Sequence, residues 1–348
     1  MSRRSTPQLL ALVLLALALV VAALLPVPYV LLSPGPVIDV LGAPGGKPLI
    51  TISGAPTFPT TGQLDLTTVS ETGGPYGRVP LPRVVAGWLD PSIAVVPTDL
   101  LYPPGTTSQQ VEQQNTQEMM QSQDSAVVAA LRHVGVPVTL EVTVASIQPG
   151  SPSAGHLKVG DRVTAVDGTP VGTGDQIRTA ESKHKPGQRV VFTVVRGGVT
   201  MRLTLVTAAS PVDPSVAVVG FTPSDGYTSP VTVHIQLDNI GGPSAGLMFT
   251  IGIVDKLTAV QENGGAHVAG TGTIDASGNV GDIGGIRQKM AGARADGATI
   301  FLVPAGNCAE ALMGVPAGLR LVKVSTLDDA LAGLAAAVAG GSAPTCTP

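Results

Sequence analysis

Residues 241–246, Gly-Gly-Pro-Ser-Ala-Gly, place Ser244 at a turn between a predicted strand over 231–237 and an apolar helix that begins LMFTIGIVDKL. Backbone N–H groups at the start of a helix can stabilise a developing oxyanion, and small neighbours let a substrate backbone come close. This is the setting that a nucleophilic serine needs. The same spacing is also typical of a serine that only caps a helix.

A serine hydroxyl is a weak nucleophile until a base takes its proton. Lys289, forty-five residues after Ser244, lies beside Ile286 and Met290 near the start of a second predicted helix. Burial among apolar groups lowers the pKa of a lysine, so its neutral amine can serve as the base in a Ser–Lys pair. A lone helical lysine is more often a solvated charge. The other nearby base is His234, which lies in a strand with no acidic partner indicated by the sequence.

The elements that must position these side chains begin far upstream. Residues 33–107 are rich in Pro, Gly and Thr, with short alternating runs such as 63–69, which predicts strands and turns. A long helix is predicted over about 108–134 and ends at Gly135 and Pro137. Its predicted apolar face comprises Met120, Val127, Leu131 and Val134.

The chain from 138 to 208 changes to strands broken by glycines. Its Gly-Ser-Pro-Ser-Ala-Gly loop (150–155), Gly-Asp-Arg turn (160–162) and Val-Asp-Gly turn (166–168) resemble a bacterial PDZ domain. Such domains bind a peptide as an added strand beside a helix. The resemblance places the peptide groove between the 140–146 strand and the following helix, with four lining residues: Val142, Val144, Ile177 and Ala180. The alternative is a structural spacer without a ligand.

The segments GGPSAG (241–246) and TGTIDASGNVGDIGGIRQKMAGARADGATIFLVP (271–304) together resemble the proteolytic domain of Lon proteases. The resemblance implies that Ser244 is the nucleophile and Lys289, at the end of Gly-Gly-x-x-x-Lys, is the catalytic lysine. It gives supporting positions to Thr271 and Gly242. The family often has an acidic residue directly before Gly-Pro-Ser-Ala-Gly; here two glycines stand there, and Asp238 lies further back.

The two resemblances imply an α+β fold, a Lon proteolytic domain (a ribosomal-protein-S5-like α/β sandwich) with an inserted PDZ domain. Residues 119–135 resemble the first helix of the Lon domain, so we expect that domain to be split. The expected parts are a stub and anchor at 1–32, protease parts at 33–137 and 209–340, the PDZ domain at 138–208 and a tail at 341–348. The alternative is a linear order in which 33–137 is a separate domain.

Residues 8–25 contain no charge, and the apolar character continues to Leu32. About 20 apolar residues suffice for a helix to cross a bilayer. Arg3 and Arg4 precede the run, so the positive-inside rule predicts one transmembrane helix in the cytoplasmic membrane, with the N-terminus inside and the catalytic region outside. The alternative is a cleaved signal peptide.

Several classes of function are disfavoured by composition. The formal charge of -4 gives no support to a nucleic acid partner. No Cys/His group has metal-ligand spacing and no GxxxxGK[ST] phosphate loop occurs, so no metal, cofactor or ATP requirement is expected. Cys308 and Cys346 are the only cysteines; the sequence leaves open whether they form a disulfide.

The sequence thus predicts an ATP-independent serine endopeptidase, anchored in the membrane and facing outward, whose PDZ domain captures substrate peptides. The expected partners are protein or peptide substrates, the membrane and, in a homo-oligomer, further copies of the chain. A catalytically silent PDZ adaptor at the membrane is the alternative.

Overall fold

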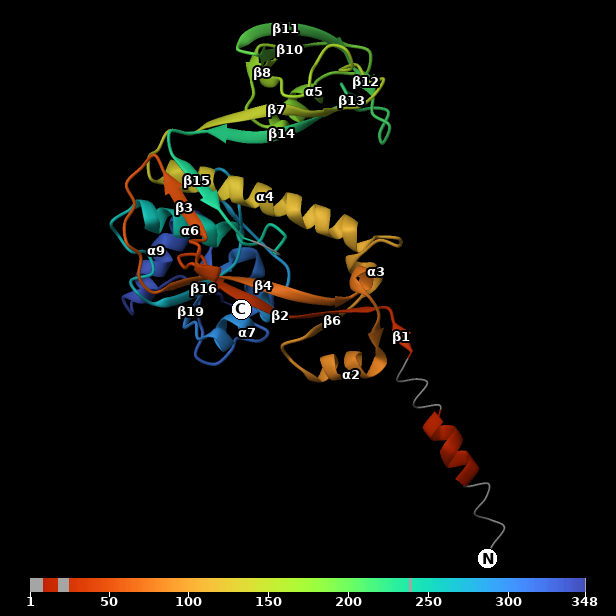
Figure 1. The fold of residues 1–348 in the computed structure, drawn as a ribbon, viewed down its shortest axis with the longest axis vertical. Coiled ribbons are helices and arrows are strands. Elements are labelled where there is room, and N and C mark those ends of the chain that lie inside the picture. The colour runs from red at the N-terminus through yellow and green to blue at the C-terminus, as the bar shows by residue number, and fades with distance from the viewer. Residues whose placement is uncertain (1–8, 18–24, 238–239, 348) are drawn as a thin grey trace, which may run out of the picture. The chain divides into compact units, whose positions relative to one another are not determined.

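The structure is a computed structural model that describes residues 9–17, 25–237 and 240–347 (Figure 1). The chain divides into two compact units. Unit 1 combines Met1–Val134 with Val233–Pro348, and unit 2 is the continuous segment Gly135–Thr232.

Unit 1 is built on a six-stranded mixed sheet whose strand order is β20-β19-β16-β4-β2-β6. The strands are β2 (Tyr29–Asp39), β4 (Gln63–Gly73), β6 (Ala94–Pro97), β16 (His267–Gly270), β19 (Ile300–Pro304) and β20 (Arg320–Val324). Strand β4 pairs in parallel with β16, so sequence from both sides of unit 2 forms one sheet. Every residue of β19, IFLVP, is buried, which is typical of a parallel strand covered on both faces.

Helices cover both faces of this sheet (Figure 1). On one face lie α4 (Ser108–His133) and α6 (Gly246–Leu257), which pack against each other, and on the other lies α7 (Ile286–Asp296). Helix α6 is apolar on every side, and ten of its twelve residues are buried, as a helix of that composition requires. Helix α9 (Leu327–Val338) packs on β20.

Helix α4 begins at a capping box formed by Thr107 and Gln110, as the sequence predicts. Val127 and Leu131 are buried as expected, but Met120 is 60% exposed and its neighbour Met119 is buried in its place. The reason lies in α6, because α4 meets it through small side chains that a search for large apolar residues passes over. These include Ser122, whose Oγ lies beside Gly246, and Ala126, whose carbonyl oxygen accepts a hydrogen bond of 3.4 Å from Thr250 Oγ1.

Short elements complete unit 1. They are β1 (Pro26–Val27), which pairs with β5 (Val79–Pro80), α2 (Leu81–Leu89), α3 (Thr98–Leu101), β3 (Ile50–Ser53) with β15 (Thr232–Ile235), β17 (Thr273–Ile274) with β18 (Val280–Gly281), and α8 (Cys308–Ala311).

The two cysteines form a disulfide between α8 and the C-terminal tail, closing a separation of 38 residues. A backbone hydrogen bond of 2.9 Å from Lys323 N to Pro344 O also holds the tail against β20. The C-terminal tail is therefore part of unit 1.

Unit 2 is a sheet of order β11-β10-β8-β7-β14 with one helix, α5 (Gly174–Glu181). Its strands are β7 (Thr139–Ile147), β8 (Arg162–Val166) with the short β9 (Thr169–Pro170) beside it, β10 (Arg189–Arg196), β11 (Val199–Val206) and β14 (Phe221–Thr228); β12 (Ala208–Ala209) pairs with β13 (Ala217–Val218). The unit extends past the expected boundary at 208 because β14 returns to pair with β7 along its whole length.

The predicted peptide groove of the PDZ domain was assigned to the wrong strand, since the 140–146 strand is the interior strand β7. Strand β7 pairs with β14 along its length on one side and with β8 at Val142 and Thr143 on the other, so it lies inside the sheet and not at its edge. All four predicted lining residues belong to the buried core of unit 2 (Val142, Val144, Ile177 and Ala180). Strand β14 forms one edge of the sheet and β11 the other, and α5 packs near β14: the Asp225 carboxylate accepts a hydrogen bond of 2.6 Å from Gly174 N.

The expected membrane span, residues 8–25, lies partly outside the described residues. Residues 9–17 are helical, with exposed leucines. None of the helices within the described ranges has both the length and the apolar content that a bilayer crossing requires.

Candidate active site

The turn that carries Ser244 is held by α4. Gly242 N donates a hydrogen bond of 2.9 Å to Asn115 O, and Ser122 Oγ donates one of 2.8 Å to Pro243 O. Gly242 has a φ of +86°, which glycine adopts without strain. The turn then enters α6 at Gly246. A helix that precedes unit 2 in the chain therefore fixes the backbone around a serine that follows it.

Lys289 lies in the first turns of α7 and is 3% exposed. Its Nζ is 2.9 Å from Ser244 Oγ and 3.1 Å from Thr271 Oγ1. Burial lowers the pKa of Lys289 to about 8, because the apolar surroundings disfavour the charged amine. A substantial fraction of this lysine is therefore neutral, and able to accept a proton, near pH 8.

Thr271 follows β16 directly and is fully buried. Its Oγ1 donates a hydrogen bond of 3.0 Å to Ser244 O, so its oxygen is left to accept from Lys289 Nζ. Gly272 N donates a second bond, of 2.9 Å, to the same carbonyl. Thr271 thus fixes both the backbone at Ser244 and the amine of Lys289.

The site has the parts of a base-activated nucleophile. Ser244 is hydrogen-bonded to an amine whose pKa burial lowers, so the amine is neutral often enough to accept a proton. The turn leads into the N-terminus of an apolar helix. The alternative base, His234, is an exposed residue of β15, and the basic side chain hydrogen-bonded to Ser244 is that of Lys289.

Ser244 and Lys289 lie in a cavity of about 970 Å³ in unit 1. One wall is β4, which pairs on one side with β2 over residues 65–73 and on the other with β16 only over residues 63–66. Among the described strands none pairs with the β16 side of β4 at residues 67–71, all five of which line the cavity. An open strand edge therefore runs past the serine.

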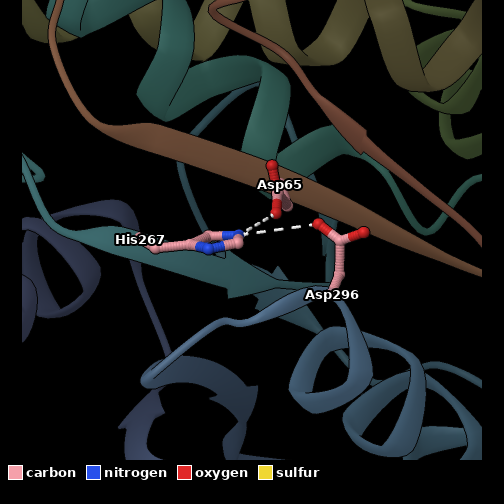
Figure 2. A group of neighbouring side chains, drawn as sticks. All are labelled: Asp65, His267 and Asp296. Carbon is pink, nitrogen blue, oxygen red and sulfur yellow. Dashed lines mark hydrogen bonds and ion pairs between the residues drawn. The ribbon is translucent and has the colours of Figure 1, made fainter.

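A second group of ionisable side chains lies on the same elements. His267 Nε2 is 2.5 Å from Asp65 Oδ2 and 3.8 Å from Asp296 Oδ2 (Figure 2). Their possible ligand atoms lie within 4.8 Å of one another, which a metal ion could span, but the His267 ring and the Asp65 carboxyl are hydrogen-bonded to each other directly. Burial raises the pKa of the Asp65 carboxyl. The group joins β4, β16 and the end of α7. Helix α7 carries Lys289, and β16 directly precedes Thr271.

Two residues of the site were not found from the sequence. Asn115 and Ser122 are polar residues on a Gln-rich helix face, far from Ser244 in the chain, and they support it through a backbone carbonyl and a hydroxyl. The only signal was the resemblance of 119–135 to a Lon helix, which indicated the element but not these contacts. Asp238, the acidic residue further back from the serine turn, lies outside the described residues.

Comparisons with known proteins agree with the two resemblances. Residues 110–207 match the family model of the PDZ domain. The chain contains a PDZ domain. It is 31% identical to the Lon protease of Azospirillum brasilense over 163 residues, which are 45% of this chain and 20% of that protein. It is 29% identical to the Lon protease of Phenylobacterium zucineum over 195 residues, 52% of this chain and 24% of that protein.

The chain thus spans only about a fifth of the length of these relatives. The matched part is about half of this chain, at about 30% identity. Among solved structures, a protein of Geobacillus thermodenitrificans is 35% identical and covers 24% of this chain and 94% of its own, with a TM-score of 0.22. The PDZ domain of the SdrC-like protein of Listeria monocytogenes is 20% identical, covering 24% of this chain and 85% of its own, with a TM-score of 0.22.

Proposed function

We propose that this chain is a membrane-anchored, ATP-independent serine endopeptidase in which Ser244 is the nucleophile and Lys289 the general base. The observation that carries the proposal is the 2.9 Å contact between Ser244 Oγ and the Nζ of a lysine that is almost fully buried. A structural lysine of this kind would need a carboxylate partner, whereas the side-chain contacts of Lys289 with described residues are two hydroxyls.

The reaction follows from these contacts. Neutral Lys289 takes the proton of Ser244 as Oγ attacks the peptide carbonyl, while Thr271 holds the amine in place. Backbone N–H groups at the start of α6 stabilise the tetrahedral oxyanion. Protonated Lys289 then gives its proton to the leaving amine, and a water activated by the same lysine hydrolyses the acyl-enzyme.

The substrate binds in extended form along the open edge of β4. Its backbone pairs with residues 67–71, as a peptide pairs with an exposed sheet edge in β-augmentation. Such main-chain recognition requires an unfolded or flexible segment. The PDZ unit presents the edge of β14 for a second, similar contact, which would hold a substrate chain near the protease.

The domain arrangement proposed is a Lon-type proteolytic domain interrupted by the PDZ unit. Two observations support it: β4 pairs with β16, and α4 packs on α6. The proposed location is the cytoplasmic membrane, with residues 8–25 as a single-pass anchor, Arg3 and Arg4 inside and the rest outside. The disulfide between Cys308 and Cys346 fits an oxidising compartment.

The test compares hydrolysis of an unfolded protein and of a fluorogenic peptide by the full-length chain and its Ser244→Ala and Lys289→Ala variants. Each substitution should lower the rate by several powers of ten, because the pair acts as a unit. Lys256→Ala is the matched control: Lys256 is another partly buried lysine whose pKa burial lowers, but its Nζ contacts Leu41 O. It should cleave like the parent protein.

Adding ATP and magnesium should not change the rate. Full activity of Ser244→Ala would contradict the assignment of Ser244 as nucleophile. Loss of activity in His234→Ala but not in Lys289→Ala would indicate that His234 is the base. A parent protein that binds peptides but cleaves none would instead be a PDZ adaptor.

A further inference from the structure

Helix α2 is apolar around most of its circumference, yet one side of it is uncovered. Val84 and Gly87 pack inward, and Gly87 lies against Leu31, Ile93 and Val95. Other side chains are exposed: Val85 by 42%, Trp88 by 58% and Leu89 by 81%. A helix that is apolar all round is normally buried, so this side lacks its covering partner.

The strand register places this helix at the end of the apolar N-terminal run. Pro26 pairs with Pro80, and Val27 with Val79. Leu25, at the end of residues 8–25, and Leu81, the first residue of α2, each directly adjoin one of the paired prolines, so the end of this segment lies beside the start of α2. If residues 8–25 enter a bilayer, the start of α2 therefore lies next to that bilayer.

A second short helix, α3, has an exposed leucine beside an exposed Asp99 and is tied to the same point. Thr98, the first residue of α3, donates a backbone hydrogen bond of 3.0 Å to Pro28 O. Leu100 of this helix is 74% exposed. Exposed apolar side chains thus gather on two short helices around the point where the apolar run ends.

The chemistry of α2 fits the surface of a bilayer. Between Gly74 and Leu89 the only charged residues are Arg78 and Arg83, both exposed. Arginine binds lipid phosphate, and tryptophan concentrates at the boundary between headgroups and acyl chains. Trp88 stacks edge to face on Tyr29, with ring centroids 5.9 Å apart, which limits its freedom before any membrane contact.

We infer that α2 lies on the surface of the membrane that holds residues 8–25, with Val85, Trp88 and Leu89 in the headgroup region. The inference rests on the membrane anchoring proposed above. The contact would fix the catalytic unit against the bilayer, where a single helix alone would let it rotate freely.

The chain contains one tryptophan, Trp88, so its fluorescence reports on α2 alone. The full-length protein is reconstituted into vesicles of phosphatidylcholine and phosphatidylglycerol, with and without phosphatidylcholine brominated at the top of its acyl chains. Flotation measures anchoring separately. We expect the protein to float and the Trp88 emission to be quenched roughly twofold by the brominated lipid, because interfacial side chains reach that depth.

Two variants serve as controls. Val85→Glu/Leu89→Glu keeps Trp88 but opposes entry into lipid, so it should float and cleave peptide like the parent protein while losing the quenching. Trp88→Phe/Val260→Trp moves the reporter to another exposed apolar position, 65% exposed, on the loop after α6. It should show no quenching.

The outcomes separate the surface contact from the anchor. Flotation with unquenched Trp88 would overturn the contact and leave the anchor standing. A blue-shifted emission that bromine does not quench would show that protein, not lipid, covers α2. A chain that does not float would overturn the anchor and the contact together, whereas peptide cleavage would still test the dyad.

Discussion

The side chains of Ser244, Thr271 and Lys289 decide the chemistry of the proposed dyad. Thr271 Oγ1 is bonded both to Ser244 O and to Lys289 Nζ, so a single hydroxyl links the nucleophile's backbone to the base. If Lys289 lost this bond, its amine would keep Ser244 as a partner but could rotate away from it. Thr271 is therefore a positioning residue in our interpretation.

Thr271→Val removes the hydroxyl and keeps the shape of the buried side chain. We expect kcat to fall by roughly 10- to 100-fold, the loss of one hydrogen bond to a charged or reacting group, with KM little changed. Thr271→Ser restores the hydroxyl and should recover most of the rate. Equal losses in both variants would indicate a packing role, and the assay is steady-state hydrolysis of a fluorogenic peptide.

The pH dependence follows from the lysine. Its ordinary pKa is about 10.4, and burial lowers it to about 8. Because the neutral amine is the active form, kcat/KM should rise about tenfold per pH unit below 8 and level off above it. A profile that levels off near pH 6.5 would contradict a lysine base. The measurement is kcat/KM from pH 6 to 10, with a denaturation control at each end.

At this scale the motifs predicted much of the site. The two segments that resemble Lon proteases named Ser244, Lys289 and Thr271, which the structure brings into hydrogen-bonding contact. Their catalytic roles stay a prediction. Asn115 and Ser122 could not be predicted, because their contacts with the serine turn depend on how α4 packs on α6.

Among the elements, the start of α7 decides where Lys289 lies. Its N-cap, Gly285, has a φ of +69°, and a Cβ there would lie 2.7 Å from Val69 Cγ2 on β4. Both the left-handed backbone and the close approach to β4 require glycine. The neighbouring Gly284 has open space around its Cα.

Gly285→Ala should therefore lower the free energy of unfolding by about 1–2 kcal/mol, the cost of a left-handed L-residue, plus the cost of displacing Val69. It should also lower kcat, because α7 shifts relative to Ser244. Gly284→Ala is the matched control and should change neither quantity much. Denaturant unfolding and peptide hydrolysis measure the two effects, and equal behaviour of both variants would refute this account.

Strands were predicted less well than motifs. The sequence located the strand at 140–146 but made it the groove strand, since the order of strands in a sheet depends on long-range pairing. Strand β14 contains Pro223 and Gly226, which break the alternation that marks a strand. The true edge of the PDZ sheet was therefore missed, although the PDZ domain itself was predicted.

At the scale of the whole molecule, the disulfide closes a separation of 38 residues and anchors the tail. Cys308 packs with Ile286 and Met290 of α7, so the bond supports the helix that carries Lys289. In the chain-entropy account, closing a loop of this length stabilises a fold by about 4 kcal/mol.

Cys308→Ala/Cys346→Ala should lower the free energy of unfolding of the full-length protein by about 2–4 kcal/mol, up to the value from chain entropy. Reducing agent should destabilise the parent protein similarly and leave the double variant unchanged. Denaturant unfolding with and without reductant is the measurement. A parent protein insensitive to reductant, with its thiols shown to be reduced, would contradict a stabilising role.

The last prediction concerns the split of the protease domain by unit 2. Thr139 of β7 pairs with Thr228 of β14, so the chain enters and leaves unit 2 at neighbouring points. Replacing residues 135–232 with a short Gly/Ser linker should then leave unit 1 folded and able to cleave small peptides, while unfolded proteins lose the PDZ contact and are cleaved more slowly.

The matched deletion keeps the nucleophile and base but removes their support. A fragment of residues 208–348 lacks β4, the parallel neighbour of β16, and α4, which holds the turn at Ser244. Large apolar surfaces of β16 and α6 would be exposed, so it should neither unfold cooperatively nor cleave peptide. Circular dichroism melts and peptide hydrolysis compare the two proteins. A folded, active 208–348 fragment would mean that the proteolytic domain is continuous and that residues 33–137 form a separate domain, as in the linear alternative.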